Sequence, residues 1–218
     1  MKLSFHIFWL VVALAAQRAN AEALIAPSFP GSAPWELASS LPQKSNDGSA
    51  SAEVKNFYPA TEDKANPKNI VSITSAHGLP SNIGTVEYLT LLAQGLQEKC
   101  ESLRATRPTL LLERRTPVSY ARLYCSRVKG NDFGVIQTIK VLQGRSNTFA
   151  VIREWHVPPF DFVLGPSVTE QFANRVFKSP DEASTWLQQM VSANDHLSNK
   201  VFICAEKQGD FGEPCATK

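Results

Sequence analysis

The stretch FGVIQTIKVLQGRSNTFAVIREWHV, residues 133–157, decides the fold class. Two runs rich in β-branched and aromatic residues, 133–142 and 148–157, flank the polar segment QGRSN. Runs of this kind, joined by a short polar segment, are typical of neighbouring antiparallel strands. Four residues of the second run share one face of the strand: Phe149, Val151, Arg153 and Trp155. The sequence therefore predicts a β-hairpin with one buried face.

Further strand patterns extend this hairpin into a meander. Residues 109–115 and 119–128 are predicted as strands, with Pro117 breaking one from the other. Shorter strands are expected over residues 70–74 and 201–204. Together these segments predict an antiparallel meander sheet of about four to six strands.

Amphipathic helices are expected to cover this sheet. Thr85 is a candidate N-cap, followed by a stripe of residues at helical spacing: Val86, Leu89, Leu92, Ala93, Leu96, Cys100 and Leu103. Residues 167–170 and 179–182 match the capping box, in which Ser and Glu side chains satisfy free amide groups at a helix start. Because a sheet with an apolar face needs a cover, we expect an α+β fold with two or three such helices.

The first 21 residues are typical of a secretory signal peptide. Lys2 precedes an apolar run over residues 3–16, and Ala19-Asn20-Ala21 fits the small-x-small cleavage pattern. A signal anchor is the alternative, but the run is shorter than the roughly 20 residues needed to span a bilayer. We expect cleavage after Ala21 and a mature chain that is periplasmic or secreted and does not span the membrane.

The charge balance argues against nucleic acid as a partner. Lys2 and Arg18 are the only charged residues of the signal and account for the formal excess of +2. Without these two, the 22 Lys and Arg of the whole chain fall to 20, against 20 Asp and Glu. A chain with no net positive field does not gather phosphates, so we expect protein partners and no nucleic acid.

Residues 22–68 differ in composition from the rest of the mature chain. They contain six prolines and many serines, without a sustained period. This composition predicts a Pro/Ser-rich arm, extended or disordered, ahead of an α+β domain over residues 69–218. Apolar islands in the arm can dock into a partner's groove or back onto their own domain; they are Phe29, Trp35, Phe57 and Tyr58.

Four cysteines in an exported chain are most simply two disulfides. Their spacing favours the local pairs Cys100 with Cys125 and Cys204 with Cys215. The alternatives are a metal site, which calls for closely spaced pairs such as C-x-x-C, and free thiols. We expect neither a metal nor a cofactor.

No catalytic motif stands out in the chain. The three histidines of the mature chain, His77, His156 and His196, each lack a second His at metal-ligand spacing. The remaining candidate for an enzyme is Glu154 with His156, because residues two apart on a strand lie on the same face. Ordinary surface is the alternative for this pair, and no catalytic residue is assigned.

The strand pair over residues 135–155, together with the helix that leads into a two-cysteine tail, resembles small exported proteins of Gram-negative bacteria. The resemblance covers residues 85–215 and implies an envelope setting, with no established activity and no site residues.

Three functional classes follow. The first is a non-catalytic binding or scaffold protein, an accessory component of a bacterial envelope assembly. The second is a secreted inhibitor or immunity-type protein that inserts the loop over residues 156–162, with Pro158, Pro159 and Phe160 at its centre. The third is an unrecognised periplasmic hydrolase.

Overall fold

The computed structural model describes residues 22–26, 29–31, 33–44, 48–162, 170–205 and 213–214. Two sheets and three helices account for most of these residues. The strands are β1 (Glu22–Ile25), β2 (Trp35–Lys44), β3 (Ser51–Pro59), β4 (Asn69–His77), β5 (Leu103–Ala105), β6 (Thr109–Glu113), β7 (Thr116–Cys125), β8 (Gly134–Gln143), β9 (Asn147–Val157), β10 (Phe202–Ala205) and β11 (Glu213–Pro214). The helices are α1 (Thr85–Gln97), α2 (Glu170–Val176) and α3 (Pro180–Lys200).

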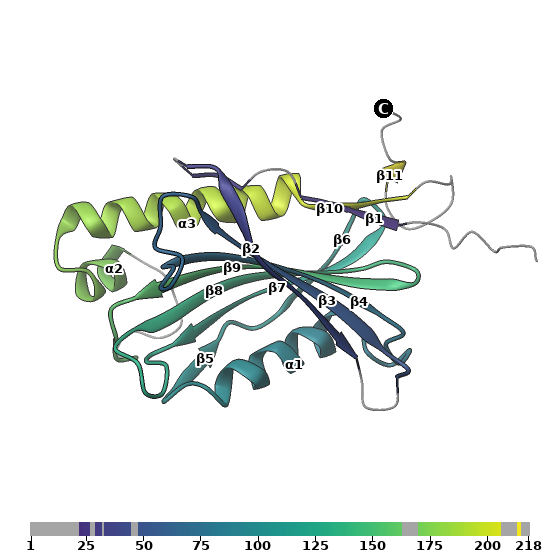
Figure 1. Ribbon diagram of the computed structural model, residues 1–218, viewed down its shortest axis with the longest axis horizontal. Coiled ribbons are helices and arrows are strands. Elements are labelled where there is room, and N and C mark those ends of the chain that lie inside the picture. Colours follow the sequence, from purple (N-terminus) through teal and green to yellow (C-terminus); the bar gives the residue numbers. More distant parts are fainter. Residues whose placement is uncertain are drawn as a thin grey trace, which may run out of the picture.

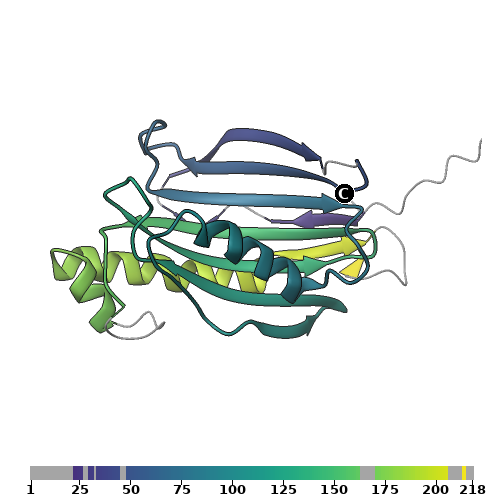
Figure 2. The ribbon, with the colours of Figure 1, turned by 90° about the horizontal axis from the view of Figure 1, so that it is seen from below.

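The large sheet has eight antiparallel strands in the order β2-β3-β4-β9-β8-β7-β5, and β6 pairs with the other half of β7. Helix α1 covers one face, and α2 and α3 lie on the other face (Figures 1 and 2). A small sheet of β1, β10 and β11 continues the α3 side. The predicted hairpin of β8 and β9 therefore lies in the middle of the sheet, and both of its faces are covered.

Side-chain alternation fills the two layers of the core. On the α1 face, Ala121 and Leu123 of β7 pack with Leu89 of α1. On the opposite face, Tyr124 of β7 and Trp155 of β9 pack against Trp186 of α3 and its neighbours. Strand patterns in this region are confirmed, but two buried faces replace the single buried face that the sequence predicted.

The helix starts follow the expected signals in part. Ser179 caps α3, because its hydroxyl oxygen accepts from the amide of Glu182 at 3.2 Å, and Pro180 opens the helix. Gly84 is the N-cap of α1, while the Thr85 hydroxyl instead forms a buried 2.6 Å hydrogen bond with that of Ser119. The capping box over residues 167–170 lies mostly outside the described residues, and α2 begins at Glu170.

The predicted α+β fold class is wrong: the described chain is mostly β, with a large and a small sheet and only three helices. The sheet has eight strands, not four to six, and the segment predicted as a Pro/Ser-rich arm supplies β1, β2 and β3. Polar hydrogen bonds join β2, β3 and β4: Ser72 Oγ donates to Asn56 Oδ1 at 2.6 Å, and Asn56 Nδ2 donates to Ser39 Oγ at 3.0 Å. Because such cross-strand pairs are polar, they leave no hydrophobic period in the sequence.

The boundary between β6 and β7 also differs from the prediction. The first strand ends at Glu113, since Arg114 and Arg115 have φ of 47° and 66° and form a two-residue turn. Pro117 lies inside β7 and does not break it. Pairing of β7 with β8 begins only at Val118, so the missing N–H of Pro117 costs no ladder hydrogen bond.

Lys140 of β8 carries a charge into the core. Its side chain is fully buried. Its ammonium group donates to Glu113 Oε2 at 2.8 Å and to the carbonyl oxygens of Leu197 and Val201 at 2.8 and 2.7 Å. Burial lowers the pKa of Lys140, and the Glu113 carboxylate opposes that shift. The charge thus joins the hairpin of β6 and β7 and the end of α3 to the centre of the sheet.

The disulfide between Cys100 and Cys125 is confirmed and joins the end of the α1 segment to β7. Cys204 is also disulfide-bonded, and Cys215, its predicted partner, lies outside the described residues. An intramolecular disulfide fits an oxidising compartment outside the cytoplasm. In the described part of the chain, no helix combines the length and apolar character needed to cross a membrane.

We predict that Lys140→Met lowers the free energy of unfolding by about 2 to 4 kcal/mol, because two buried carbonyl oxygens and the partly buried Glu113 carboxylate lose their donor. Urea denaturation followed by circular dichroism measures the change. Lys99→Met, at an exposed position, is the control and should leave the midpoint nearly unchanged. Equal midpoints for the two variants would show that the Lys140 hydrogen bonds do not stabilise the fold.

Candidate functional site

An open groove of about 980 Å³ lies where one end of the sheet meets α3. The segment before β4 and the β7–β8 turn contribute Lys68 and Phe133. The end of β9 adds residues 155–159, and the first turns of α3 add Thr185 and Trp186. The groove is within the size range of ligand sites, which are concave and mainly lined by apolar and aromatic side chains.

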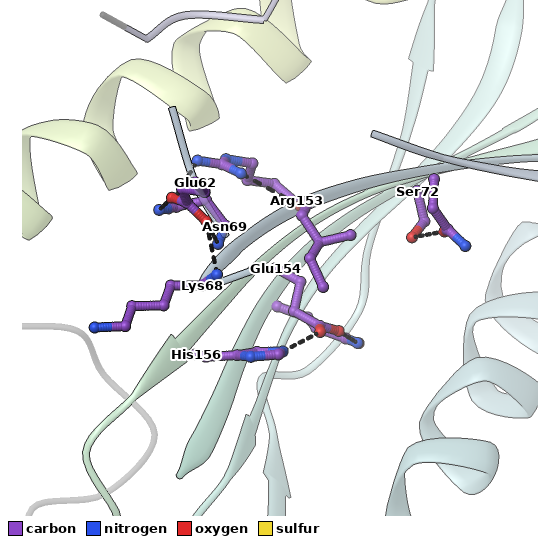
Figure 3. Close-up of polar contacts among 10 residues, drawn as sticks. Glu62, Lys68, Asn69, Ser72, Arg153, Glu154 and His156 are labelled. Carbon is purple, nitrogen blue, oxygen red and sulfur yellow. Dashed lines mark hydrogen bonds and ion pairs between the residues drawn. The ribbon is translucent and has the colours of Figure 1, made fainter. Parts of the chain in front are cut away.

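His156 and Glu154 form a hydrogen-bonded pair on the α1 side of β9. Nε2 of His156 lies 2.9 Å from Glu154 Oε1. Figure 3 marks this contact with a dashed line. Gln137 of β8 donates to the other carboxylate oxygen at 2.6 Å. The imidazole ring stacks on Phe133, with 4.2 Å between the ring centroids and 13° between the planes. The predicted proximity of this pair is confirmed, and its ring is held in place from both sides.

Arg153 lies on the opposite side of the same strand, between two indole rings. Its guanidinium carbon is 4.5 Å from the ring centroid of Trp35 and 4.8 Å from that of Trp155. It donates to the carbonyl oxygen of Ile70 at 3.3 Å and to Asn69 Oδ1 at 3.1 Å. Burial lowers the pKa of Arg153 to about 10, although the nearby carboxylates act in the other direction. Arg153 thereby fixes the start of β4 beside the groove.

Glu62 holds the segment that leads into β4. Its Oε2 accepts from the backbone amides of Lys68 and Asn69 at 2.6 and 2.9 Å, and its Oε1 accepts from the Asn69 side-chain amide. Figure 3 shows Glu62 and Asn69 beside Arg153. This closed loop of residues 62–69 forms one wall of the groove, and the Glu62 carboxylate ties its two ends together.

Three ring nitrogens of groove-lining residues have no hydrogen-bond partner in the described part of the chain. They are Nε1 of Trp155, Nε1 of Trp186 and Nδ1 of His156, and each atom is buried. A buried polar atom without a partner costs about 1 to 3 kcal/mol. Native proteins contain few of them, so three beside one groove need an explanation.

The rim of the groove carries both signs of charge. Lys68 and Lys178 are exposed there, as are Asp132, Asp181 and Glu182. This balance does not select a strongly charged ligand. It fits a ligand that has donors, acceptors and apolar groups along its length.

The described lining of the groove contains part of a catalytic arrangement. A carboxylate that orients an imidazole is an arrangement used in general base catalysis. However, the residues described around the groove include no Ser or Cys that His156 could activate. Among the described residues, no cluster of three or more His, Cys, Asp or Glu is placed to hold a metal ion.

The residues predicted to bind a partner fall into two groups. Pro158 and Pro159 line the groove. Phe160 packs against the core beneath α2 and α3, as does Phe162, so these two rings of the expected inhibitory loop point inward. This packing does not favour the inhibitor reading.

Of the other four predicted residues, Phe29, Trp35 and Phe57 pack in the cluster on the α3 side of the sheet, and Tyr58, the next residue of β3, faces the opposite way. Trp35 Nε1 donates to the carbonyl oxygen of Phe29 at 3.0 Å, and the Phe29 ring lies 4.8 Å from that of His196. Phe57 packs in the same cluster, and Tyr58 is 6% exposed. These side chains dock onto their own domain, which was the alternative to partner binding; a role in partner binding stays a prediction.

Several groove residues were not predicted from the sequence, among them Trp155, Trp186, Phe133 and Lys68. Trp155 and Trp186 were assigned to core stripes, and they do pack in the core. Two properties identify them as candidate site residues: their position beside an open groove and their free N–H groups. Neither property can be read from the amino-acid sequence. For Phe133 the sequence contains a weak indication. It immediately precedes β8, and His156 lies near the end of β9, the strand that pairs with β8.

Comparisons with protein-family models, curated proteins and solved structures give no match to this chain. The functional argument therefore depends on the geometry of the groove.

We predict that Glu62→Ala opens the loop over residues 62–69. Hydrogen exchange measured by mass spectrometry should show the amides of Lys68 and Asn69 exchanging at least about tenfold faster, since hydrogen bonds to a charged acceptor are worth about 1.5 to 3 kcal/mol. The control is Glu36→Ala, which removes only an exposed ion pair with Lys64. Unchanged exchange in Glu62→Ala would mean that the carboxylate does not hold this wall.

Proposed function

We propose that this chain is an exported, non-catalytic binding protein, an accessory component of a bacterial envelope assembly, whose groove holds an extended segment of a protein partner. The observation that carries the proposal is the open groove of about 980 Å³, whose lining includes three residues with an unpartnered ring nitrogen. These nitrogens are buried, so a ligand would supply their missing partners once the rings turn toward the groove, and it would then recover the free energy that the unbound protein gives up.

The chemistry of the lining favours a peptide as that ligand. Indole N–H groups are donors only, and peptide carbonyl oxygens are suitable acceptors for Trp155 and Trp186. His156 Nε2 faces the Glu154 carboxylate, so in the neutral ring with its proton on Nε2, Nδ1 is an acceptor for a peptide N–H. The partly exposed rings of Phe133 and Phe177 offer contacts for apolar side chains of the same segment.

Export is supported by the N-terminal sequence and by the disulfide. Residues 1–21 have the pattern of a cleavable signal, and Cys100–Cys125 suits an oxidising compartment. The envelope setting is supported further by the resemblance to small exported proteins of Gram-negative bacteria. A hydrolase is less well supported, because no Ser or Cys lines the described groove beside His156.

The proposal predicts that a bulky residue in the groove abolishes partner binding. Thr185 is exposed and lines the groove, so Thr185→Trp should displace the bound segment. Ser184, the neighbouring exposed residue of α3, does not line it, and Ser184→Trp is the matched control. Affinity purification from the native envelope, with mass spectrometry of the co-purifying proteins, measures the difference.

The expected result is a stoichiometric partner with the wild type and with Ser184→Trp, and its loss with Thr185→Trp. Recovery of the same partner with Thr185→Trp would exclude the groove as its site. If the wild-type chain is recovered alone, the proposed function is wrong, and a small-ligand binder or an enzyme becomes the better description.

A second prediction concerns the start of the mature chain. Glu22 opens β1 and pairs with Ala205, and its carboxylate accepts from the backbone amides of Arg145 and Ser146 at the β8–β9 turn. Cleavage after Ala21 leaves this contact intact. The intact mass of the protein from the periplasm or the medium should therefore correspond to residues 22–218; a mass that includes residues 1–21 would contradict export by a cleaved signal.

A further inference from the structure

The large sheet ends in two edge strands that differ in their protection against pairing. β2 forms one edge, and β5 and β6 together form the other. Edge strands expose unpaired backbone groups, and proteins block them with bulges, prolines and charges. β2 has these features: its register shifts between Leu37 and Ser39, and it contains Pro42 and the charged residue Glu36.

β6 has none of this protection over residues 109–112. Its sequence there is Thr-Leu-Leu-Leu, and the three leucines are among the most exposed large apolar residues of the described chain. Leu110, Leu111 and Leu112 are 62%, 46% and 73% exposed. An apolar, uncharged edge strand is a template for a further strand, and an exposed patch of this kind marks an interaction site.

The pairing with β7 determines which backbone groups of β6 remain free. Pro117 lies opposite Leu112 and has no N–H, so these two residues cannot form a hydrogen-bonded pair. Even-numbered residues of β7 face this edge, because Arg122 O accepts from Thr106 N at 2.9 Å and Ser126 N donates to Ser102 O at 3.0 Å. Leu111, opposite Val118, therefore bonds to β7, and Leu110 and Leu112 direct their backbone groups outward.

These outward groups are arranged symmetrically about Leu111. A second β6 strand, antiparallel and related by a two-fold axis at Leu111, would place Leu110 opposite Leu112 of the second copy. Both pairs of this kind would be hydrogen-bonded, which satisfies every free group of Leu110 and Leu112. Leu111 would face Leu111 of the second copy in the closer, non-hydrogen-bonded position.

The side chains favour the same arrangement. Leu110 and Leu112 lie on the α1 face, since Leu110 pairs with Ser119, whose hydroxyl meets Thr85 of α1. In the two-fold pair, four leucines of this face would come together, two from each copy. Residues 109–112 carry no charge, and the carboxylate that follows them, that of Glu113, is already bonded to Lys140 and Tyr120.

We propose that β6 pairs with β6 of a second copy of this chain, so that two large sheets join at their unprotected edges into a two-fold dimer. The interface is isologous, as is usual for dimers of identical chains. It is separate from the groove, so the dimer and the bound segment do not compete.

Sedimentation velocity at micromolar concentrations of the full mature chain tests this proposal. The wild type should sediment as a dimer, and Leu111→Lys should sediment as a monomer with an unchanged circular dichroism spectrum. Leu37→Lys, at a leucine of similar exposure on β2, should remain a dimer. A monomeric wild type, or a dimer that survives Leu111→Lys, would overturn the proposal.

A cross-link keeps the test independent of how well the Lys variant folds. In the two-fold pair, the Cα atoms at position 111 are roughly 4.5 Å apart, a separation that a disulfide can span. Mild oxidation of Leu111→Cys should give a covalent dimer on non-reducing gels, and Leu37→Cys should not. Absence of this dimer, or equal dimer from both variants, would exclude pairing at β6.

Discussion

The buried ammonium group of Lys140 is the contact on which the arrangement of the layers depends. β8 lies at the centre of a sheet that is covered on both faces, so a charged side chain on this strand must find its partners inside. Lys140 finds them in Glu113 at the edge hairpin and in the carbonyl oxygens of Leu197 and Val201 where α3 ends. A single charge therefore fixes both the edge hairpin and the C-terminal end of the long helix against the centre of the sheet.

The sequence predicted the parts of the fold whose side chains alternate between core and solvent or follow a helical stripe. The hairpin of β8 and β9, the helices α1 and α3 and the pairing of Cys100 with Cys125 belong to these parts. The sequence did not predict β2 and β3, because these strands are held by backbone pairing and by the polar contacts of Ser39, Asn56 and Ser72. Sheet edges that bury little apolar surface leave no period to detect.

The candidate site was predictable only in fragments. Strand geometry placed Glu154 and His156 on one face, and Pro158 and Pro159, predicted to bind a partner, line the groove, although partner binding itself stays a prediction. What makes these residues a site is the approach of three distant segments: the loop closed by Glu62, the β7–β8 turn and the first turns of α3. Their meeting is a property of the topology, and no local pattern contains it.

Two sets of buried polar atoms differ in how fully their hydrogen bonds are matched. Around Lys140, each donor and acceptor discussed above is matched, with distances of 2.7 to 2.8 Å. Beside the groove, at the other end of α3, Trp155, Trp186 and His156 each retain a buried nitrogen without a partner in the described residues. Two buried hydroxyls away from the groove, those of Thr116 and Thr138, also lack a partner in the described residues. What distinguishes the three nitrogens is that their residues line one open groove, and we therefore propose a ligand bound there as their missing partner.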